Sequence, residues 1–270
     1  MRILFFGDIV GKIGRQAVKK ALPLLKEKYQ LDLVLANVEN LAHGKGITSK
    51  TLKEMKEAGL DAFTSGNHIW KKEEVESAIL EAEVKLATPA NDIRTTGQGG
   101  YIELLVGSKK LLVVNLLGRV FMDQQDADAA SGLACPFKTI DEILSSRLDF
   151  SGPVLVDLHA EATSEKVAMG WYLDGRVAAV LGTHTHVPTA DYKILPQGTA
   201  YVTDVGMVGP VDSVLGVEKE LIIEKFLTDG PIVFKIPESG QVEINAVYLE
   251  IDDQTDRVKK FEKINQTVEI

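Results

Sequence analysis

The sequence predicts an α/β fold built on two β-sheets, and two patterns along the chain lead to this prediction. Over much of the first two thirds of the 270 residues, short apolar runs alternate with amphipathic stretches, which is typical of parallel strands joined by crossover helices. Later segments such as 240–252 (GQVEINAVYLEID) alternate apolar and polar residues with a period of two, as antiparallel strands do. The two patterns together fit a two-sheet α/β sandwich better than a single open sheet. A chain of this length can enclose one large core, so we expect one domain over residues 1–270.

The expected strands and helices follow from local composition. Strands are expected where apolar residues run together, over residues 2–6, 31–37, 61–67, 153–159 and 177–181. Helices are expected over amphipathic stretches, at residues 15–28, 48–58 and 71–83 and from about residue 164. Thr48 is a suitable N-cap for the second of these helices, and the glycine after Ala58 is a suitable C-terminal stop. Gly107 and Ser108 predict the turn of a hairpin that spans residues 99–118.

Composition and charge restrict the class of protein. The formal net charge is −9 and the sequence pI is about 5.2, so we expect no extended basic surface for nucleic acid. A small anionic ligand is compatible with this charge, because bound metal ions can make a pocket locally positive. No apolar run approaches the roughly 18 residues of a membrane span, and the apolar start of the chain is too short for a secretion signal. Cys135 is the single cysteine, which excludes an internal disulfide and a thiolate cluster for zinc, so we expect the cytoplasm.

Polar residues that are suited to metal binding gather where the expected strands end. They include four of the five histidines of the chain. The set is Asp8, Glu39, Asn40, Asn67, His68, His159, His184 and His186. Taken singly, some have a simpler interpretation, such as Asp8 as a helix cap or Asn40 and Asn67 as turn residues. Functional sites of α/β folds are built at this edge of the sheet, and the joint pattern therefore predicts one site.

The segment GTHTH places His184 and His186 one residue apart after an apolar strand. If the segment stays extended, the two imidazoles point to the same side, with their Cα atoms about 6.5–7 Å apart. They can then converge on one ion, or each can bind one of two ions about 3.5–4 Å apart. At least six N and O donors lie at this edge, which is more than one tetrahedral zinc ion can use. The mixture suits a pair of Fe, Mn or Zn ions bridged by one carboxylate.

Five motifs occur together in a characteristic order: FFGDIVGKIGR, NVENLAHGKGIT, TSGNHIW, DLHAEATSEK and GTHTHVPTAD, followed by YVTDVGMVGPVDSVLG. In this order they resemble the calcineurin-like metallophosphoesterases, and among these the YmdB-type bacterial branch, which hydrolyses cyclic nucleotides. The general superfamily pattern has a histidine where this chain has Val10 and an aspartate where it has Glu39. Both departures resemble the YmdB-type branch, with Asn40 available to replace the missing imidazole.

The resemblance implies a fold, a cofactor and a set of ligands. The fold is a four-layer αββα sandwich, and the cofactor is a pair of metal ions. The mixture of O and N donors favours Fe or Mn for these ions, with Zn as the alternative. One ion is held by Asp8, Glu39, Asn40 and His186, and the other by Asn67, His159, His184 and the bridging Glu39. His68 points into the site without binding metal and is the candidate general acid for the leaving oxygen.

The implied activity is hydrolysis of a phosphodiester, namely a 3′,5′- or 2′,3′-cyclic nucleotide, by a hydroxide that bridges the two ions. Asp157 and Glu161 flank His159 and are candidates for orienting the ligand imidazoles. The irregular, polar segment 118–136 is long for a loop, and we expect it to face the substrate, with Arg119 as a phosphate contact.

Two alternatives stay open from the sequence. The same metal ligands serve phosphomonoesterases and nucleotidases, because the residues that discriminate between substrates lie in loops. The site could instead serve binding in a regulatory protein with little turnover, although a complete ligand set together with His68 favours catalysis. The expected partner is a small phosphoester and not a membrane, and a homo-oligomer is compatible with the sequence.

Overall fold

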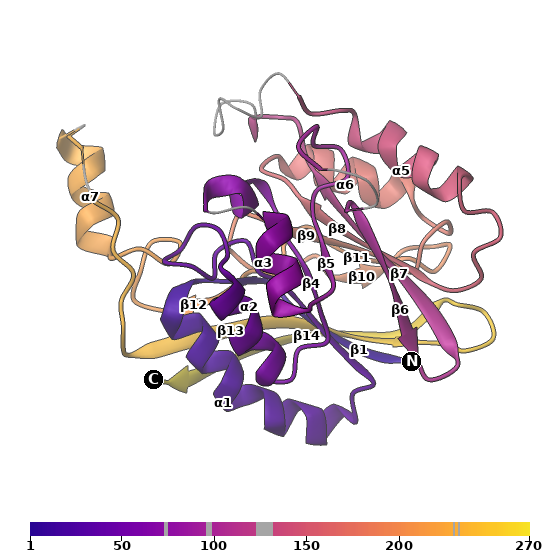
Figure 1. The fold of residues 1–270 in the computed structure, drawn as a ribbon, viewed down its shortest axis with the longest axis horizontal. Helices are drawn as coiled ribbons and strands as arrows, with labels where there is room; N and C mark the ends of the chain where they lie inside the picture. The colour runs from indigo at the N-terminus through magenta and orange to yellow at the C-terminus, as the bar shows by residue number, and fades with distance from the viewer. Residues whose placement is uncertain (73–74, 96–98, 123–131, 229, 232) are drawn as a thin grey trace.

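The computed structural model describes residues 1–72, 75–95, 99–122, 132–228, 230–231 and 233–270. Two mixed β-sheets pack face to face, and helices cover the outer face of each sheet (Figure 1). The segment 118–136 is expected to face the substrate, and its residues 123–131 lie outside the described residues.

The first sheet combines strands from both ends of the chain. Its spatial order is β2 (Asp8–Ile9), β12 (Met207–Pro210), β13 (Gln241–Ile251), β1 (Arg2–Phe6), β3 (Leu33–Asn37), β4 (Ala62–Thr64) and β5 (Leu86–Ala87), with β14 (Val258–Glu269) paired to β13. The second sheet has the order β10 (Lys193–Ile194), β11 (Ala200–Val202), β9 (Ala179–Thr183), β8 (Val154–His159), β7 (Lys109–Leu117) and β6 (Tyr101–Val106). Strands β1, β3, β4 and β5 run parallel, as do β7, β8, β9 and β11. Within each sheet, the carboxyl ends of these strands therefore lie at one edge.

The helices divide between the two outer faces. The first sheet is covered by α1 (Gly11–Tyr29), α2 (Ser49–Glu57) and α3 (Val75–Ala82), and the second by α5 (Pro136–Ser145) and α6 (Thr163–Tyr172). A short 3-10 helix, η1 (Asn67–Lys71), follows β4. Helix α7 (Lys219–Thr228) stands away from both sheets and buries none of its residues (Figure 1). In the described part of the chain, no helix has the length and apolar character needed to cross a bilayer.

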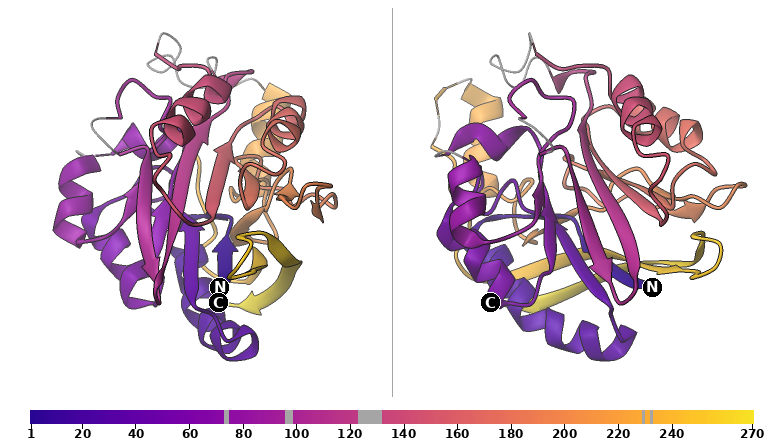
Figure 2. Two further views of the ribbon diagram at one scale, coloured as in Figure 1. Left: turned by 90° about the vertical axis from the view of Figure 1, so that its right-hand side faces the viewer. Right: turned by 45° about the vertical axis from the view of Figure 1, so that its right-hand side comes forward.

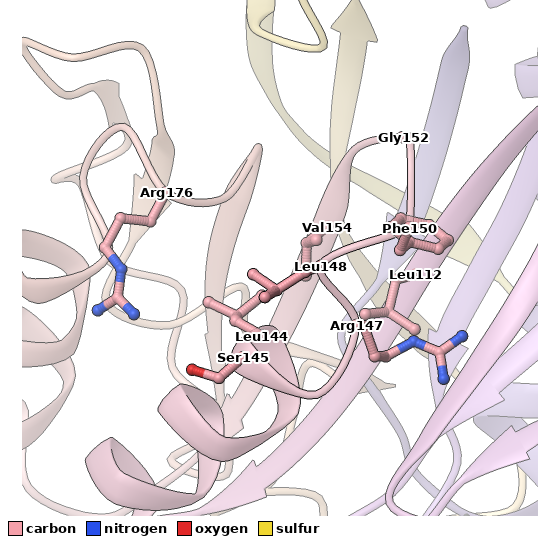
Figure 3. Close-up of a pocket in the computed structure, with 9 residues that line it drawn as sticks. All are labelled: Leu112, Leu144, Ser145, Arg147, Leu148, Phe150, Gly152, Val154 and Arg176. Atoms are coloured by element: carbon pink, nitrogen blue, oxygen red, sulfur yellow. The ribbon is translucent and has the colours of Figure 1, made fainter.

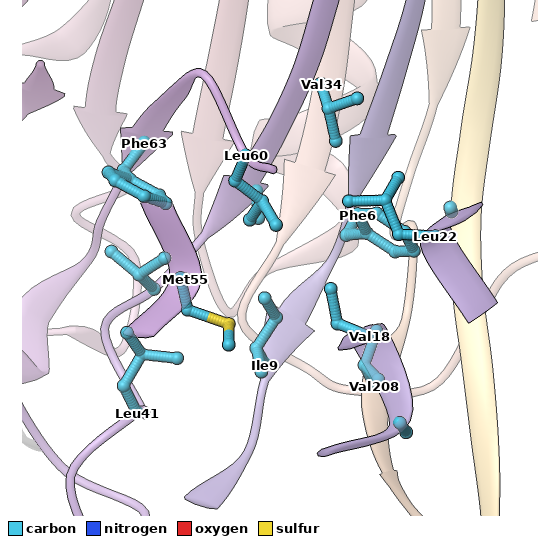
Figure 4. Packing of buried hydrophobic residues seen from close by; sticks show 14 of the residues in the cluster. Phe6, Ile9, Val18, Leu22, Val34, Leu41, Met55, Leu60, Phe63 and Val208 are labelled. Carbon is cyan, nitrogen blue, oxygen red and sulfur yellow. The ribbon is translucent and has the colours of Figure 1, made fainter. Parts of the chain in front are cut away.

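Strand β1 explains why some of the predicted strands are apolar throughout. Successive side chains of a strand point to opposite faces. Leu4 and Phe6 belong to the core between the first sheet and its helices, in which Figure 4 shows Phe6. Ile3 and Phe5 belong to the core between the two sheets. A third core, which includes Ile140 of α5, lies between the second sheet and its helices. The resulting order of helix, sheet, sheet and helix, seen from two sides in Figure 2, confirms the predicted αββα sandwich.

Local predictions differ in outcome. The hairpin is confirmed, since β6 and β7 are joined through Gly107 and Ser108, and Gly107 has the positive φ of 62° that favours glycine. The first helix was predicted from residue 15, but α1 begins at Gly11, whose N–H donates to the carbonyl of Asn40 at 2.9 Å. In the last third, β13 and β14 are antiparallel as predicted, but α7 is a helix where strands were expected.

Candidate metal centre

The structure brings together all eight residues that were predicted at the strand ends. Those from the first sheet come after β1, β3 and β4, and those from the second sheet end β8 or follow β9. In chain order they are Asp8, Glu39, Asn40, Asn67, His68, His159, His184 and His186. Five of them are buried, and the partly exposed side chains are His68, His184 and His186, at 25%, 9% and 14%.

One half of the centre is formed by Glu39, Asn67, His159 and His184. Ligand atoms of Glu39, His159 and His184 lie within 4.8 Å of one another, close enough for one ion to bind all three. The Nε2 atom of His159 lies 3.3 Å from Glu39 Oε1 and 3.2 Å from Asn67 Oδ1. It also lies 3.0 Å from His184 Nδ1. These contacts group the four residues as the resemblance implied for one ion.

The other half is formed by Asp8, Asn40 and His186, and Glu39 touches it as well. The Nδ2 atom of Asn40 lies 3.2 Å from His186 Nε2 and donates to Glu39 Oε1 at 3.1 Å. Asp8 Oδ1 lies 4.0 Å from His186 Nε2, and Asp8 Oδ2 accepts the backbone N–H of His184 at 3.2 Å. Because the Asn40 amide turns its nitrogen toward these groups, binding a metal through Oδ1 requires the amide to rotate.

Unpartnered atoms test whether these residues fit a metal ion. In the described centre, Asp8 Oδ1 and Asn67 Nδ2 are buried and have no hydrogen-bond partner. Buried polar atoms are normally satisfied, so a lone carboxylate oxygen needs a specific explanation. A set of two carboxylates, two amides and three imidazoles offers the mixed O and N donors that Fe, Mn and Zn bind. The residues therefore fit a metal centre.

Charge in the centre points the same way. Burial raises the pKa of Asp8. Burial would also raise the pKa of Glu39, but the charge on His159 opposes it and the pKa is held well below its usual range. For His159, burial lowers the pKa, while Glu39 and Asp8 outweigh it and raise the pKa to about 9. Burial and the neighbouring charge of His159 lower the pKa of His184, which keeps that imidazole in the neutral form that binds metal. Glu39 and Asp8 thus stabilise a positive charge on the buried His159, and a site that binds a cation must stabilise positive charge in the same way.

His68 differs from the other histidines in its position. Its Nδ1 lies 3.0 Å from Asn40 Oδ1 and 3.2 Å from Glu39 Oε1, and its backbone N–H donates to Glu39 Oε2 at 2.8 Å. The side chain is 25% exposed, whereas His159 is fully buried. His68 is therefore fixed to the ligand residues and still reachable by a substrate.

The segment GTHTH does not have the predicted extended conformation. Strand β9 ends at Thr183, and φ is +98° at His184 and +64° at His186. Positive φ is uncommon for residues other than glycine and needs support from the surroundings. As a result, the two imidazoles do not point to the same place. The imidazole of His184 contacts His159, and that of His186 contacts Asn40.

The support comes from two residues that sequence reasoning missed, Lys166 and Asp204. Both are buried, and Lys166 Nζ lies 2.8 Å from Asp204 Oδ2. The same carboxylate accepts the backbone N–H and the hydroxyl of Thr185, at 3.1 and 2.8 Å, and the N–H of Gly206 at 2.8 Å. The motif YVTDVGMVG contains Asp204 and offered a signal, but a lysine on an amphipathic helix is ordinarily read as a surface residue.

Asp157 and Glu161 lie near the candidate ligand histidines in different ways. Glu161 Oε2 lies 3.0 Å from His184 Nε2 and contacts that imidazole directly. Asp157 has no direct hydrogen bond to His159. It accepts from the Thr183 hydroxyl at 2.7 Å, and this hydroxyl lies 2.9 Å from His159 Nδ1. Burial raises the pKa of Asp157 to about 6.

Comparison with known proteins decides the family. Residues 4–264 match the family described as YmdB-like protein. The chain belongs to the YmdB-like family. Over 264 residues it is 46% identical to the 2′,3′-cyclic-nucleotide 2′-phosphodiesterase of Bacillus subtilis, and the match covers 98% of this chain and 96% of that protein. The crystal structure of a phosphatase from Mycoplasma pneumoniae has a TM-score of 0.88 at 37% identity, covering 100% of this chain and 94% of that chain.

A more distant likeness concerns the fold alone. The calcineurin-like phosphoesterase YfkN of Bacillus subtilis has a TM-score of 0.58 at 13% identity, and the match covers 99% of this chain and 90% of that chain. Its fold agrees with the sandwich seen in this YmdB-like chain. The predicted resemblance to the YmdB-type branch is therefore confirmed, and the chain shares its fold with a calcineurin-like phosphoesterase.

Outside the centre, the predicted phosphate contact Arg119 lies just beyond β7. Its backbone N–H donates to Glu165 at 3.0 Å and its side chain is exposed. Within the described residues, no contact joins that side chain to the metal ligands.

A cavity of about 390 Å³ lies far from the candidate centre, at the amino ends of β7 and β8, beside Leu112 and Val154 (Figure 3). Its two arginines are already paired, Arg147 with Glu103 and Arg176 with Asp141. None of the residues that line this cavity belongs to the candidate metal centre.

Proposed function

We propose that this phosphoric-ester hydrolase is a dinuclear-metal phosphodiesterase that opens the 2′,3′-cyclic phosphate of nucleotides. The observation that carries the proposal is the position of Glu39, whose Oε1 lies within 3.3 Å of groups in both halves of the candidate centre. A carboxylate in that position can serve two ions at once. The activity of the Bacillus subtilis relative, at 46% identity over nearly the whole chain, supports the choice of substrate.

The two halves supply two sets of ligands. One ion would be held by Asp8, Glu39, Asn40 and His186, and the other by Glu39, Asn67, His159 and His184. Two bound divalent ions would lower the pKa of a coordinated water and offset negative charge on the phosphoryl oxygens. The half with Asp8, Glu39 and Asn40 is rich in oxygen donors and favours Fe or Mn, because Zn usually binds four ligands in a tetrahedral arrangement.

The other residues orient the ligands and move a proton. Glu161 fixes the ring of His184 through Nε2, and Asp157 acts on His159 through the hydroxyl of Thr183. Such partners hold a ligand imidazole in one orientation. His68 Nδ1 lies 3.2 Å from Glu39 Oε1, which leaves Nε2 as the nitrogen available for a substrate proton.

The reaction consumes one water. The oxygen of water forms a bond to phosphorus, and the bond between phosphorus and the ribose 2′-oxygen breaks. His68 gives its proton to the departing 2′-oxygen. The proton lost by water goes to solvent, and His68 is reprotonated from solvent. The product is a nucleoside 3′-phosphate. A positioned acid of this kind typically contributes about 10²–10⁴-fold to the rate.

The proposal is tested by comparing substrates on the metal-loaded enzyme. We expect 2′,3′-cyclic AMP to be converted to adenosine 3′-phosphate with a higher kcat/KM than 3′,5′-cyclic AMP or 5′-AMP. Fastest turnover of 5′-AMP would establish a nucleotidase instead. Absence of turnover for all three, with both ions bound, would favour a regulatory role for the site.

A further inference from the structure

A cavity of about 580 Å³ opens directly beside the candidate metal centre. Asn40, His68 and His186 form the wall on the side of the metal ligands. Much of the remaining wall is apolar and includes the aromatic residues Phe226 and Phe234. The volume lies within the range of cavities that bind small molecules, and the combination of an apolar wall with a few polar groups is typical of them.

The apolar wall is held in place relative to the metal ligands. His186 Nδ1 lies 3.0 Å from the carbonyl oxygen of Leu215, which lines the cavity. The N–H of Glu218 donates to the carbonyl of Lys235 at 2.8 Å, so the two segments that flank α7 are joined at its base. Ile236 packs so closely on Gly44 that a Cβ there would lie 2.6 Å from Ile236 Cδ1. The segments that carry Leu215 and Ile236 are therefore tied to the centre and to the rest of the fold.

The cavity is also positively charged. Lys45, Lys72 and Lys225 line it, and the described residues of its wall include no carboxylate. The Nζ atoms of Lys45 and Lys225 lie 5.4 and 5.2 Å from the centroid of the Phe234 ring. On a chain with a net charge of −9, this concentration of lysines beside an exposed aromatic ring suits a ligand that is both aromatic and anionic.

We propose that this cavity binds the nucleobase of the substrate, with Phe234 as the aromatic surface on which the base stacks. The proposal rests on the proposed function, because it places the phosphate at the metal ligands and the base in the adjoining cavity. Lys45 and Lys225 donate to acceptor atoms on the base or to phosphate oxygens, and an incoming base displaces the weak contact of an ammonium group with the ring. Since every base has a π face, stacking of this kind accepts different bases. The cavity therefore selects nucleotides over phosphodiesters that lack a base.

The test compares Phe234→Ala with wild type on two substrates. The substrates are 2′,3′-cyclic AMP and glycerol 1,2-cyclic phosphate, which has the same ring phosphate without a base. For the cyclic nucleotide, kcat/KM should fall by about 5- to 100-fold, mainly through KM, as is typical for the loss of one base-stacking contact. The loss on glycerol 1,2-cyclic phosphate should be much smaller. Phe234→Tyr should restore most of the activity on the nucleotide.

Val233→Ala is the matched control, because Val233 is exposed on the same segment and does not line the cavity. It should behave as wild type on both substrates. Equal losses on both substrates in Phe234→Ala would overturn the base-binding role and leave the phosphodiesterase proposal intact. Calorimetric binding of adenosine tests the cavity independently of turnover. If wild type hydrolyses neither diester, the proposed function fails. In that case, weaker adenosine binding by Phe234→Ala still supports base binding in the cavity, and unchanged binding contradicts it.

Discussion

At the scale of single residues, Glu39 is the one on which both halves of the candidate centre depend. We predict that Glu39→Gln lowers kcat/KM more than Asn40→Ala, because in the proposed centre the Glu39 carboxylate serves both ions with its charge, whereas the Asn40 amide is neutral and serves one. The loss should exceed the roughly 10- to 100-fold that is typical of residues outside the direct ligands. Rate and metal content, measured on the same preparations, should fall together. A Glu39→Gln protein with full metal and a near-normal rate would exclude the bridging role.

For His68, we predict a loss of rate without a loss of metal. The residue contacts Glu39 and Asn40 but is not needed to complete either ligand set. In His68→Ala, turnover of 2′,3′-cyclic AMP should fall by about 10²–10⁴-fold, because its alkoxide leaving group needs a proton. A p-nitrophenyl phosphodiester releases a stable phenolate, so its rate should fall far less.

The two substrates are compared at matched metal occupancy. Equal losses on both would assign His68 to substrate binding or charge stabilisation. Release of an ion in His68→Ala would make it a ligand, contrary to the division of residues proposed above.

At the scale of elements, the loop after β9 shows what holds the candidate ligands His184 and His186. The backbone at His184 and His186 has positive φ, and Asp204 fixes the residue between them. We predict that Asp204→Asn lowers the free energy of unfolding by about 3–5 kcal/mol, because Lys166 is left as a buried charge without a partner. Metal content should fall as well, since the loop loses its anchor. Denaturant unfolding and elemental analysis measure the two effects.

Asp141→Asn is the matched control for that variant, because it breaks an ion pair with Arg176 in which both side chains are well exposed. Exposed pairs contribute little, so its stability should stay close to wild type. A similar, small change in both variants would mean that the buried pair does not anchor the loop.

Asp191 stabilises the C-terminal part of the same loop. It accepts hydrogen bonds from Thr189 and Thr203. Burial alone would raise its pKa, but these hydrogen bonds outweigh burial and hold the pKa below the ordinary value. A depressed folded-state pKa means that the stabilisation is complete above the unfolded pKa, near 3.9, and is lost as the pH falls through the lower folded value.

We therefore predict that Asp191→Asn destabilises the protein at pH 7 by no more than about 1 kcal/mol, because the carboxylate is partly solvated. The difference from wild type should shrink as the pH is lowered below about 4. Unfolding curves between pH 3 and 7 measure it, with the exposed Asp149→Asn as control. A difference that grows toward low pH would reverse the sign of this linkage.

Helix α7 shows why some elements could not be predicted. Ile222, Ile223, Phe226 and Leu227 are apolar, yet the helix buries none of its residues. Sequence reasoning looks for an apolar stripe that packs on a core, and here no core receives it. The early start of α1 is a second case, because its first turn is set by a contact between Gly11 and Asn40 that is distant in sequence.

At the scale of the whole molecule, the parallel strands of two sheets explain how eight residues spread over positions 8–186 meet at one place. The sequence predicted these residues, because strand ends and donor types are readable along the chain. The family resemblance also implied that His184 and His186 belong to different halves. What the sequence did not predict is the positive φ at both histidines, because that conformation is supported by Lys166 and Asp204. The single domain over residues 1–270, the cytoplasmic location and a homo-oligomer stay predictions.

The number of metal ions per chain tests the central claim most directly. The ligand residues should be loaded by reconstitution with Mn²⁺ or Fe²⁺, followed by removal of loosely bound metal and elemental analysis against protein concentration. Activity on 2′,3′-cyclic AMP should rise in step with metal content, and a chelator should abolish it. The account predicts saturation at two ions per chain, because Glu39 lies between two sets of donors. Saturation at one ion, with full activity, would contradict it and leave a mononuclear site at Glu39, His159 and His184.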